Sequence, residues 1–412
     1  MTLKQCLLIL LPLILLYLSQ TYSCTTAIVT GKATPDGRPL LWKHRDSDFI
    51  QNKMMFFEDG QLNYIGLVNG VDSTGAEVWA GCNSAGFAIM NAASYNLNIN
   101  DTTGIKDREG ILMKAALQVC TTLHDFENLL DSLPKPLGVE ANFGAIDASG
   151  GAAYYETGNF EFRKVDVNDL RLAPSGYLIR TNYSFTGKMN QGYGYIRYNT
   201  ALELFDFASA TNNLTAPFIL QQVSRSLKHS LTQVDLAKLP YPSKLNPPEL
   251  VFFIDFIPRF SSTSSIVVQG VQPVDSPDLT TLWTLLGFPL GSVMIPIWVQ
   301  GGMRLPKVLT DDGTGKALLC EMSLQLKKCY FPVKRGSGKN YLNRAALFNQ
   351  EQNGILQKIE SLEKRILKRT QQLLRQQNNK KLNTAAIQNF YDWIDQTIIS
   401  EYGELMKLYL AP

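Results

Sequence analysis

The amino-terminal segment determines where the folded chain is expected to begin. Lys4 is followed by an apolar run over residues 7–18 and then by polar residues up to Cys24. A basic, an apolar and a small-residue region in this order are typical of a secretory signal. The apolar run is shorter than the roughly 20 residues that a membrane span needs. We therefore expect a signal peptide over residues 1–23, a mature chain that begins at Cys24, and a secreted or periplasmic protein.

Cys24 itself has three possible roles. Lipidation would anchor the protein in a membrane, although Thr21 stands where the lipidation motif usually has Leu. A disulfide is possible in an oxidising compartment, but no partner for Cys24 is selected, and Cys320 with Cys329 is the pair that we expect. Catalysis is the third role, because a terminal α-amine with a pKa of about 7.7 to 8.0 can accept the proton of a thiol with a pKa of about 8.5.

The composition excludes several other classes of protein. With 412 residues, of which 45% are apolar and 18% charged, the chain is a folded globular protein rather than a disordered or polytopic membrane protein. A net charge of +3 gives no reason to expect a nucleic-acid partner. The three histidines, His44, His124 and His229, have no metal-ligand spacing and no nucleophile motif beside them. An enzyme of this sequence is expected to use another base.

The pattern along residues 24–305 predicts one layered α+β domain. Residues 24–31 and 39–44 are rich in β-branched and apolar residues on either side of a turn, which predicts a hairpin headed by Cys24. Further strands surround two helices expected over residues 110–120 and 123–133. The remaining predicted elements are helices over residues 195–208 and 216–227 and strands over residues 265–271 and 292–300.

Residues 306–412 are expected to form a connection and a helical appendage. One helix face is predicted from five apolar positions: Ile355, Ile359, Leu362, Ile366 and Leu373. Arg369 interrupts this apolar seam, so a helix docked on its own domain fits better than a long coiled coil. A homo-oligomer formed through this helix is the alternative.

The segment CTTAIVTGKATPDGRPLLWKHRDSDF, residues 24–49, resembles the start of N-terminal nucleophile hydrolases of the choloylglycine hydrolase and penicillin V acylase type. It is also similar to isopenicillin N acyltransferase relatives, and its GKATPDG stretch is similar to secreted dipeptidases of the same superfamily. The resemblance implies a four-layer αββα sandwich, in which helices flank two antiparallel sheets. It also implies that no metal or organic cofactor is needed.

Arg45 and Asp48 have the spacing of an Arg and an Asp that follow the opening strand in these families. A guanidinium beside the thiol favours the thiolate, and a carboxylate can orient the α-amine. Asp46 competes with Asp48, because strand alternation puts both on one face, and only the family spacing selects Asp48. The alternative for Arg45 and Asp48 is a solvated ion pair at a strand end.

Three more residues are implied by the resemblance. Asn182 in RTNYS resembles an Asn that positions the substrate carbonyl, and Arg197 in YIRYNTA resembles a supporting Arg at a helix start. Asn91 in GFAIMNAAS lies near the position of an oxyanion-hole residue. Ordinary turn and cap chemistry is the alternative for all three.

These observations together predict an exported amidohydrolase. Its Cys24 nucleophile would cleave a linear amide through a thioester, and an amine in place of water would make the enzyme an acyltransferase. The expected partner is a small-molecule amide or a short peptide, with a membrane involved only if Cys24 is lipidated. The alternatives are a cysteine dipeptidase of the same superfamily and a lipid-anchored interaction protein without enzymatic activity.

Overall fold

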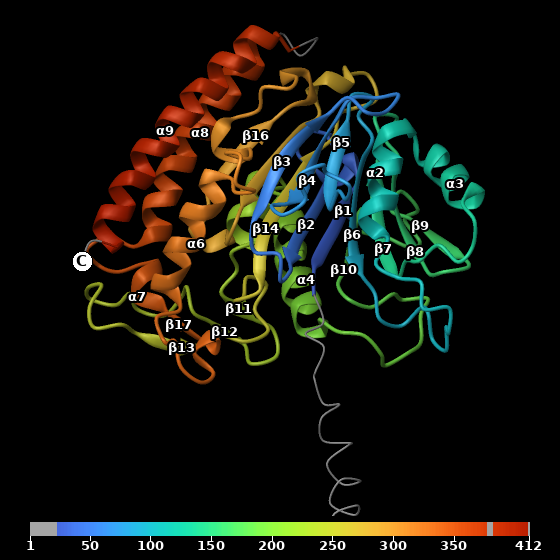
Figure 1. Ribbon diagram of the computed structural model, residues 1–412. Coiled ribbons are helices and arrows are strands. Elements are labelled where there is room, and N and C mark those ends of the chain that lie inside the picture. The colour runs from blue at the N-terminus through green and yellow to red at the C-terminus, as the bar shows by residue number, and fades with distance from the viewer. Residues whose placement is uncertain (1–22, 377–381, 411–412) are drawn as a thin grey trace, which may run out of the picture.

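Two antiparallel β-sheets packed face to face form the centre of the computed structural model, which describes residues 23–376 and 382–410 (Figure 1). The predicted signal peptide lies outside the described residues except for Ser23. Strands β1 and β2 of one sheet contact β6 and β7 of the other. Apolar side chains from both sheets fill the space between them.

The first sheet has six strands, in the spatial order β10 (Tyr177–Arg180), β1 (Thr25–Val29), β2 (Leu40–Asp46), β14 (Ser262–Gln269), β15 (Thr281–Leu286) and β16 (Met294–Ile297). The second sheet has seven strands in sequence order: β3 (Asn52–Phe57), β4 (Tyr64–Asn69), β5 (Ala80–Asn83), β6 (Ala88–Ala93), β7 (Ala141–Ile146), β8 (Ala152–Thr157) and β9 (Phe162–Asp166). Two short ribbons pair β11 (Lys228–His229) with β12 (Val234–Asp235) and β13 (Leu250–Phe252) with β17 (Tyr341–Asn343).

The hairpin predicted at the start of the mature chain is present as β1 and β2. Alternation along β1 explains its central place. Ala27 and Val29 belong to the apolar cluster beneath the outer helices, whereas Ile28 belongs to the cluster between the two sheets. Both faces of β1 are therefore buried.

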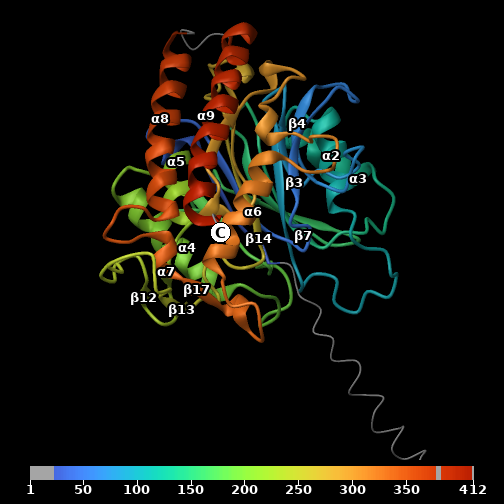
Figure 2. The ribbon, with the colours of Figure 1, turned by 60° about the vertical axis from the view of Figure 1, so that its left-hand side comes forward.

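Helices cover the outer face of each sheet (Figure 2). The second sheet carries α2 (Glu109–Val119) and α3 (Leu123–Ser132), and Thr122 caps α3 in a capping box with Asp125. The first sheet carries α4 (Tyr195–Ala210), α5 (Ala216–Phe218) and a π-helical turn over Ile219–Val223. The layers are helix, sheet, sheet, helix, and the predicted αββα class is confirmed.

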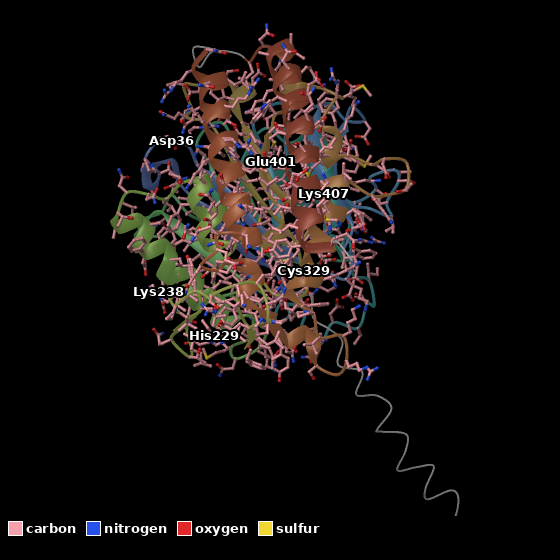
Figure 3. The ribbon with its side chains drawn as sticks, turned by 90° about the vertical axis from the view of Figure 1, so that its left-hand side faces the viewer. Asp36, His229, Lys238, Cys329, Glu401 and Lys407 are labelled. Carbon is pink, nitrogen blue, oxygen red and sulfur yellow. The ribbon has the colours of Figure 1, made fainter. Side chains whose placement is uncertain are left out.

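The C-terminal residues pack along the β16 side of the first sheet (Figure 1). Figure 3 views them from the outside, with Glu401 and Lys407 on the last helix. They form α6 (Leu318–Tyr330), α7 (Arg344–Leu347), α8 (Ile355–Gln376) and α9 (Thr384–Leu410). All five apolar positions predicted for one helix face are buried on α8. This helix shares one core with the sheets, and the domain boundary at residue 305 stays a prediction. Among the described helices, none combines the length and apolar character needed to cross a membrane.

The predicted disulfide between Cys320 and Cys329 is wrong. Both residues lie on α6, nine positions apart, which separates them by about 13 Å along the helix axis. A disulfide needs Cα atoms within roughly 7 Å of each other. Both are free thiols, as are the other three cysteines among the described residues.

A buried ion pair joins α8 to the helical layer of the first sheet. Arg225 Nη2 lies 2.6 Å from Glu363 Oε1, and both side chains are almost fully buried. Arg225 also donates to the carbonyl oxygens of Pro289 and Ser292, while Glu363 accepts from the backbone N–H of Met294. Every polar group of this pair therefore has partners, as burial requires.

We expect Glu363→Gln to lower the free energy of unfolding by about 3–5 kcal/mol, because it leaves the Arg225 charge buried without a counter-charge. The control is Glu401→Gln, which removes the exposed Arg365–Glu401 pair between α8 and α9 and is expected to cost no more than about 1 kcal/mol. Urea unfolding measures both. Equal losses in the two variants would show that the buried pair does not hold α8 in place.

Candidate active site

The pairing of β1 with β2 places Cys24 opposite Arg45. Thr25 lies opposite His44 and Thr26 opposite Lys43, so the same register continued by one residue pairs Cys24 with Arg45. Directly opposed residues of an antiparallel pair have Cβ atoms about 4.5–5.5 Å apart and share a face. Cys24 is buried at the head of a central strand.

A cavity of about 640 Å³ opens beside Cys24. Residues of the first sheet and of the loop after it form one wall: Cys24, Lys43, Arg45, Asp46, Ser47 and Phe49. The second sheet, the loops around it and α2 form the other: Glu77, Trp79, Asn91, Ala93, Ser94, Tyr95, Asn98, Lys106, Asp107, Glu109, Val139 and Glu140. The cavity is therefore large enough for a small organic substrate at the sulfur atom.

The Arg45 guanidinium is held rigidly at this cavity. Its Nη2 donates to Asn69 Oδ1 at 2.8 Å, and its Nη1 donates to Asn52 Oδ1. Its Cζ lies 5.0 Å from the centroid of the Trp79 ring, which is a cation–π contact. A fixed positive charge next to a thiol favours the thiolate.

Arg197 and Asn182 lie behind Cys24 and do not line this cavity. Arg197, near the start of α4, donates to the carbonyl oxygen of Cys24 at 2.8 Å and to Asn182 Oδ1 at 3.0 Å. Asn182 Nδ2 in turn donates to the carbonyl oxygen of Ala93 at 2.8 Å. Burial, reinforced by nearby Arg259, lowers the pKa of Arg197 to about 9. The two predicted residues thus connect the Cys24 backbone to the end of β6.

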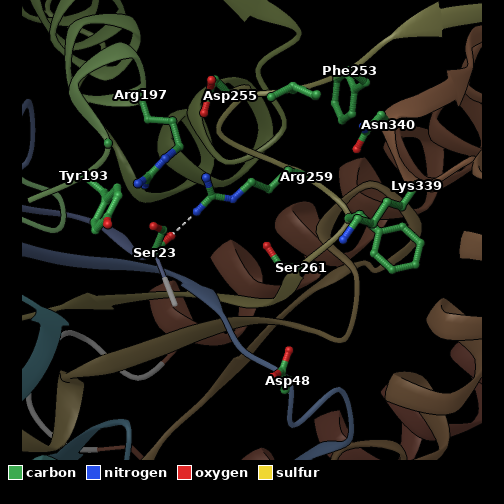
Figure 4. Close-up of a pocket in the computed structure, with 13 residues that line it drawn as sticks. Ser23, Asp48, Tyr193, Arg197, Phe253, Asp255, Arg259, Ser261, Lys339 and Asn340 are labelled. Carbon is green, nitrogen blue, oxygen red and sulfur yellow. Dashed lines mark hydrogen bonds between the residues drawn. The ribbon is translucent and has the colours of Figure 1, made fainter. Parts of the chain in front are cut away.

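The structure separates the two competing carboxylates. Asp46 is buried, accepts from Ser262 Oγ at 2.6 Å, and forms an ion pair with Arg259. Asp48 is exposed and lines a second cavity of about 410 Å³, which Ser23 and Arg197 also line. Figure 4 shows Arg259 donating to the carbonyl oxygen of Ser23, with Asp48 apart from this contact. Arg259 therefore links Asp46 to the peptide bond before Cys24, and the role expected for Asp48 stays a prediction.

Asn91 lies on β6 and lines the cavity, as a residue near an oxyanion must. Its Oδ1 accepts a hydrogen bond from Lys43, a residue that the sequence interpretation overlooked. Burial lowers the pKa of Lys43 to about 7, with Arg45 acting in the same direction. The sequence did contain a signal for Lys43 as a site residue, because strand alternation puts Lys43 on the same face as Arg45.

None of the three histidines lines the cavity that contains Cys24, although His44 shares Ser262 with Asp46. His44 is buried on the opposite face of β2, with Nε2 at 2.9 Å from Ser262 Oγ, and burial lowers its pKa to about 4. The imidazole is therefore neutral near pH 7. His124 and His229 do not line the cavity.

Glu109, the first residue of α2, is the most perturbed acid of the cavity. Its Oε1 accepts from the backbone N–H of Glu140 at 2.9 Å. Burial raises the pKa of Glu109 to about 7, and this effect outweighs that hydrogen bond. Together with Glu77 and Glu140, it places carboxyl groups on the wall that faces the nucleophile.

The likeness of this chain to known proteins is remote. No family model matches the chain, and no curated protein matches it. Solved structures similar to it include an N-acylethanolamine-hydrolyzing acid amidase ortholog from Caenorhabditis elegans, at 13% identity and a TM-score of 0.36, which covers 62% of this chain and 96% of that chain. A conjugated bile acid hydrolase variant from Clostridium perfringens has 11% identity and a TM-score of 0.40, covering 67% and 92%. Penicillin V acylase from Agrobacterium tumefaciens has 11% and 0.36, covering 67% and 86%.

Structural similarity at 11–13% sequence identity shows neither the activity nor the substrate of this chain. The fold assignment rests on the two stacked sheets and their helices.

We expect Glu109→Gln to stabilise the protein more at pH 8 than at pH 5. The pKa of Glu109 is raised on folding, so its favourable contribution is complete below the unfolded value of about 4.5 and is lost as the pH rises through about 7. Glutamine does not titrate, so the variant does not lose this stability as the pH rises. Thermal unfolding of the variant and the native protein at both pH values measures the difference.

Glu58→Gln, at an exposed position, is the matched control. A difference in melting temperature for Glu109→Gln that is the same at pH 5 and pH 8 would contradict the raised pKa.

Proposed function

We propose that the protein is an exported amide hydrolase with Cys24 as its N-terminal nucleophile. The observation that carries the proposal is the position of Cys24 at the head of a central strand, opposite Arg45 and on the wall of a substrate-sized cavity. Removal of residues 1–23 would turn the peptide nitrogen of Cys24 into an α-amine, which supplies a base without histidine.

In the first half of the reaction, the Cys24 thiolate attacks the carbonyl carbon of a linear amide. The carbonyl π electrons move to oxygen, and the negative charge faces Asn91 Nδ2. When this intermediate collapses, the carbon–nitrogen bond breaks. The α-ammonium group gives its proton to the leaving nitrogen, and the acyl group remains on sulfur as a thioester.

In the second half, water attacks the thioester while the α-amine accepts its proton. The carbon–sulfur bond breaks, a carboxylic acid leaves, and the Cys24 thiolate is restored. If an amine replaces water, a new amide forms and the enzyme acts as an acyltransferase.

Asp46 is the carboxylate that we assign to the α-amine. What supports this assignment is the single Nη2 atom of Arg259, which donates both to Asp46 and to the carbonyl oxygen of Ser23. The nitrogen of Cys24 is bonded to that carbonyl carbon, so a new amine would lie close to Asp46. A carboxylate there orients the amine and stabilises its protonated form.

A specific observation favours the dipeptidase alternative among amide hydrolases. The cavity wall that faces Cys24 carries the carboxyl groups of Glu77, Glu109 and Glu140. Such groups suit the ammonium of a short peptide. Comparing hydrolysis of dipeptides with that of N-acyl amino acids distinguishes the two substrate classes.

We expect Cys24→Ala to lose amide hydrolysis by about 10³-fold or more, as removal of a nucleophile does. Iodoacetamide should label Cys24 of the mature protein before Cys82 and Cys320, because burial raises the pKa of both other thiols to about 12. Intact mass and peptide mapping measure the labelling. A variant that keeps full activity would contradict the proposal, and a lipid adduct on Cys24 would favour the anchored interaction protein.

We expect Asp46→Asn to reduce kcat at least about tenfold more than Asp48→Asn, because only Asp46 is buried beside the start of the mature chain. Steady-state kinetics of both variants on one amide substrate, with melting temperatures to confirm folding, measure the effect. A larger loss in Asp48→Asn would restore the assignment predicted from the family spacing.

A further inference from the structure

Lys43 is a buried cation in the middle of the first sheet. Its side chain is 1% exposed, and lysine is rarely buried this completely. Its Nζ donates to the carbonyl oxygen of Trp79 at 2.7 Å and to Asn91 Oδ1 at 2.5 Å. Both acceptors are at the second sheet, so this ammonium group crosses the space between the sheets beside the cavity that contains Cys24.

The contact with Lys43 decides which way the Asn91 amide faces. A lysine ammonium has three donors and no acceptor, so the atom that faces it must be the amide oxygen. The amide nitrogen must then face away from Lys43. Asn91 lines the Cys24 cavity, and among the described residues Nδ2 donates no hydrogen bond. An amide donor is thus left available to a molecule in the cavity.

We infer that Lys43 is a positioning residue that holds the Asn91 amide with its nitrogen towards the reacting carbonyl oxygen. This inference rests on the proposed amide hydrolysis. When the Cys24 sulfur attacks, the carbonyl oxygen of the substrate gains negative charge, and Asn91 Nδ2 donates a hydrogen bond to it. The positive charge on Lys43 polarises the same amide through Oδ1 and makes Nδ2 a stronger donor.

The charge of Lys43 depends on pH because of the groups that surround it, so its role can be tested by varying the pH. Burial, together with Arg45 on β2, opposes its charged form, whereas Cys24 just before β1 and Glu109 on α2 favour it, which leaves its pKa at about 7. Its charge is complete below that value and is lost above it. A neutral amine also accepts hydrogen bonds, so it no longer dictates which end of the Asn91 amide faces it.

The test is a double-mutant cycle on the mature protein with one amide substrate. We expect Lys43→Met to lower kcat about 10- to 100-fold with little change in KM, and Asn91→Ala to lower kcat about 10²- to 10³-fold. Because Lys43 acts through Asn91, the double variant should be no slower than Asn91→Ala. Losses that multiply in the double variant, or full kcat in Lys43→Met, would overturn the inference.

Lys53→Met is the matched control. Lys53 is equally buried, but its Nζ is paired with Asp311 rather than with a residue of the cavity. We expect this variant to lose stability and keep kcat. In addition, the decline in kcat that accompanies loss of the Lys43 charge above about pH 7 should be absent from Lys43→Met and present in Lys53→Met.

Asn91→Asp keeps the inference testable if Lys43→Met fails to fold. Aspartate still accepts from Lys43 but has no amide nitrogen, so we expect normal stability with a loss of kcat similar to that of Asn91→Ala. Full activity of Asn91→Asp would overturn the inference. Amide hydrolysis that survives in Cys24→Ala would instead contradict the proposed function, so the two failures are distinguishable.

Discussion

The candidate site depends on the antiparallel pairing of β2 with two neighbours. On one side β1 sets Thr25 opposite His44, and on the other side β14 sets Ser265 opposite the same residue. A slip of one residue would turn Lys43 and Arg45 towards the outer helices and remove both cations from Cys24. Because β2 has neighbours on both sides, such a slip would break two ladders at once. The register therefore fixes the chemistry of the cavity.

Lys43 is satisfied in a different way from the structural ion pair at α8. It donates to neutral amide and carbonyl oxygens, whereas Arg225 faces the carboxylate of Glu363. A neutral acceptor satisfies the N–H group but does not cancel its charge. The charge of Lys43 therefore remains available to polarise the Asn91 amide. In the Arg225–Glu363 pair the two charges compensate each other, so this pair suits a structural role between α8 and the first sheet.

The sequence predicted the parts of this molecule that depend on local pattern. The β1–β2 hairpin, the start of α4 and the buried face of α8 follow from residue periodicity within one segment. It could not separate Asp46 from Asp48, because alternation applies only while a strand continues, and β2 ends at Asp46. The contact between Lys43 and Asn91 joins residues 48 positions apart, which no local pattern specifies. The expected Cys320–Cys329 disulfide was wrong because one helix holds both residues.

The proposed nucleophile has its base only after the leader is removed. While Ser23 is attached, the nitrogen of Cys24 is an amide nitrogen, and its lone pair is delocalised into the carbonyl group and cannot accept a proton. Arg259 meanwhile donates to the Ser23 carbonyl oxygen and to Asp46. Cleavage before Cys24 removes that carbonyl and creates an amine beside Asp46 in the same step. Under the proposed mechanism, cleavage before Cys24 therefore completes the catalytic group, and the uncleaved chain is inactive.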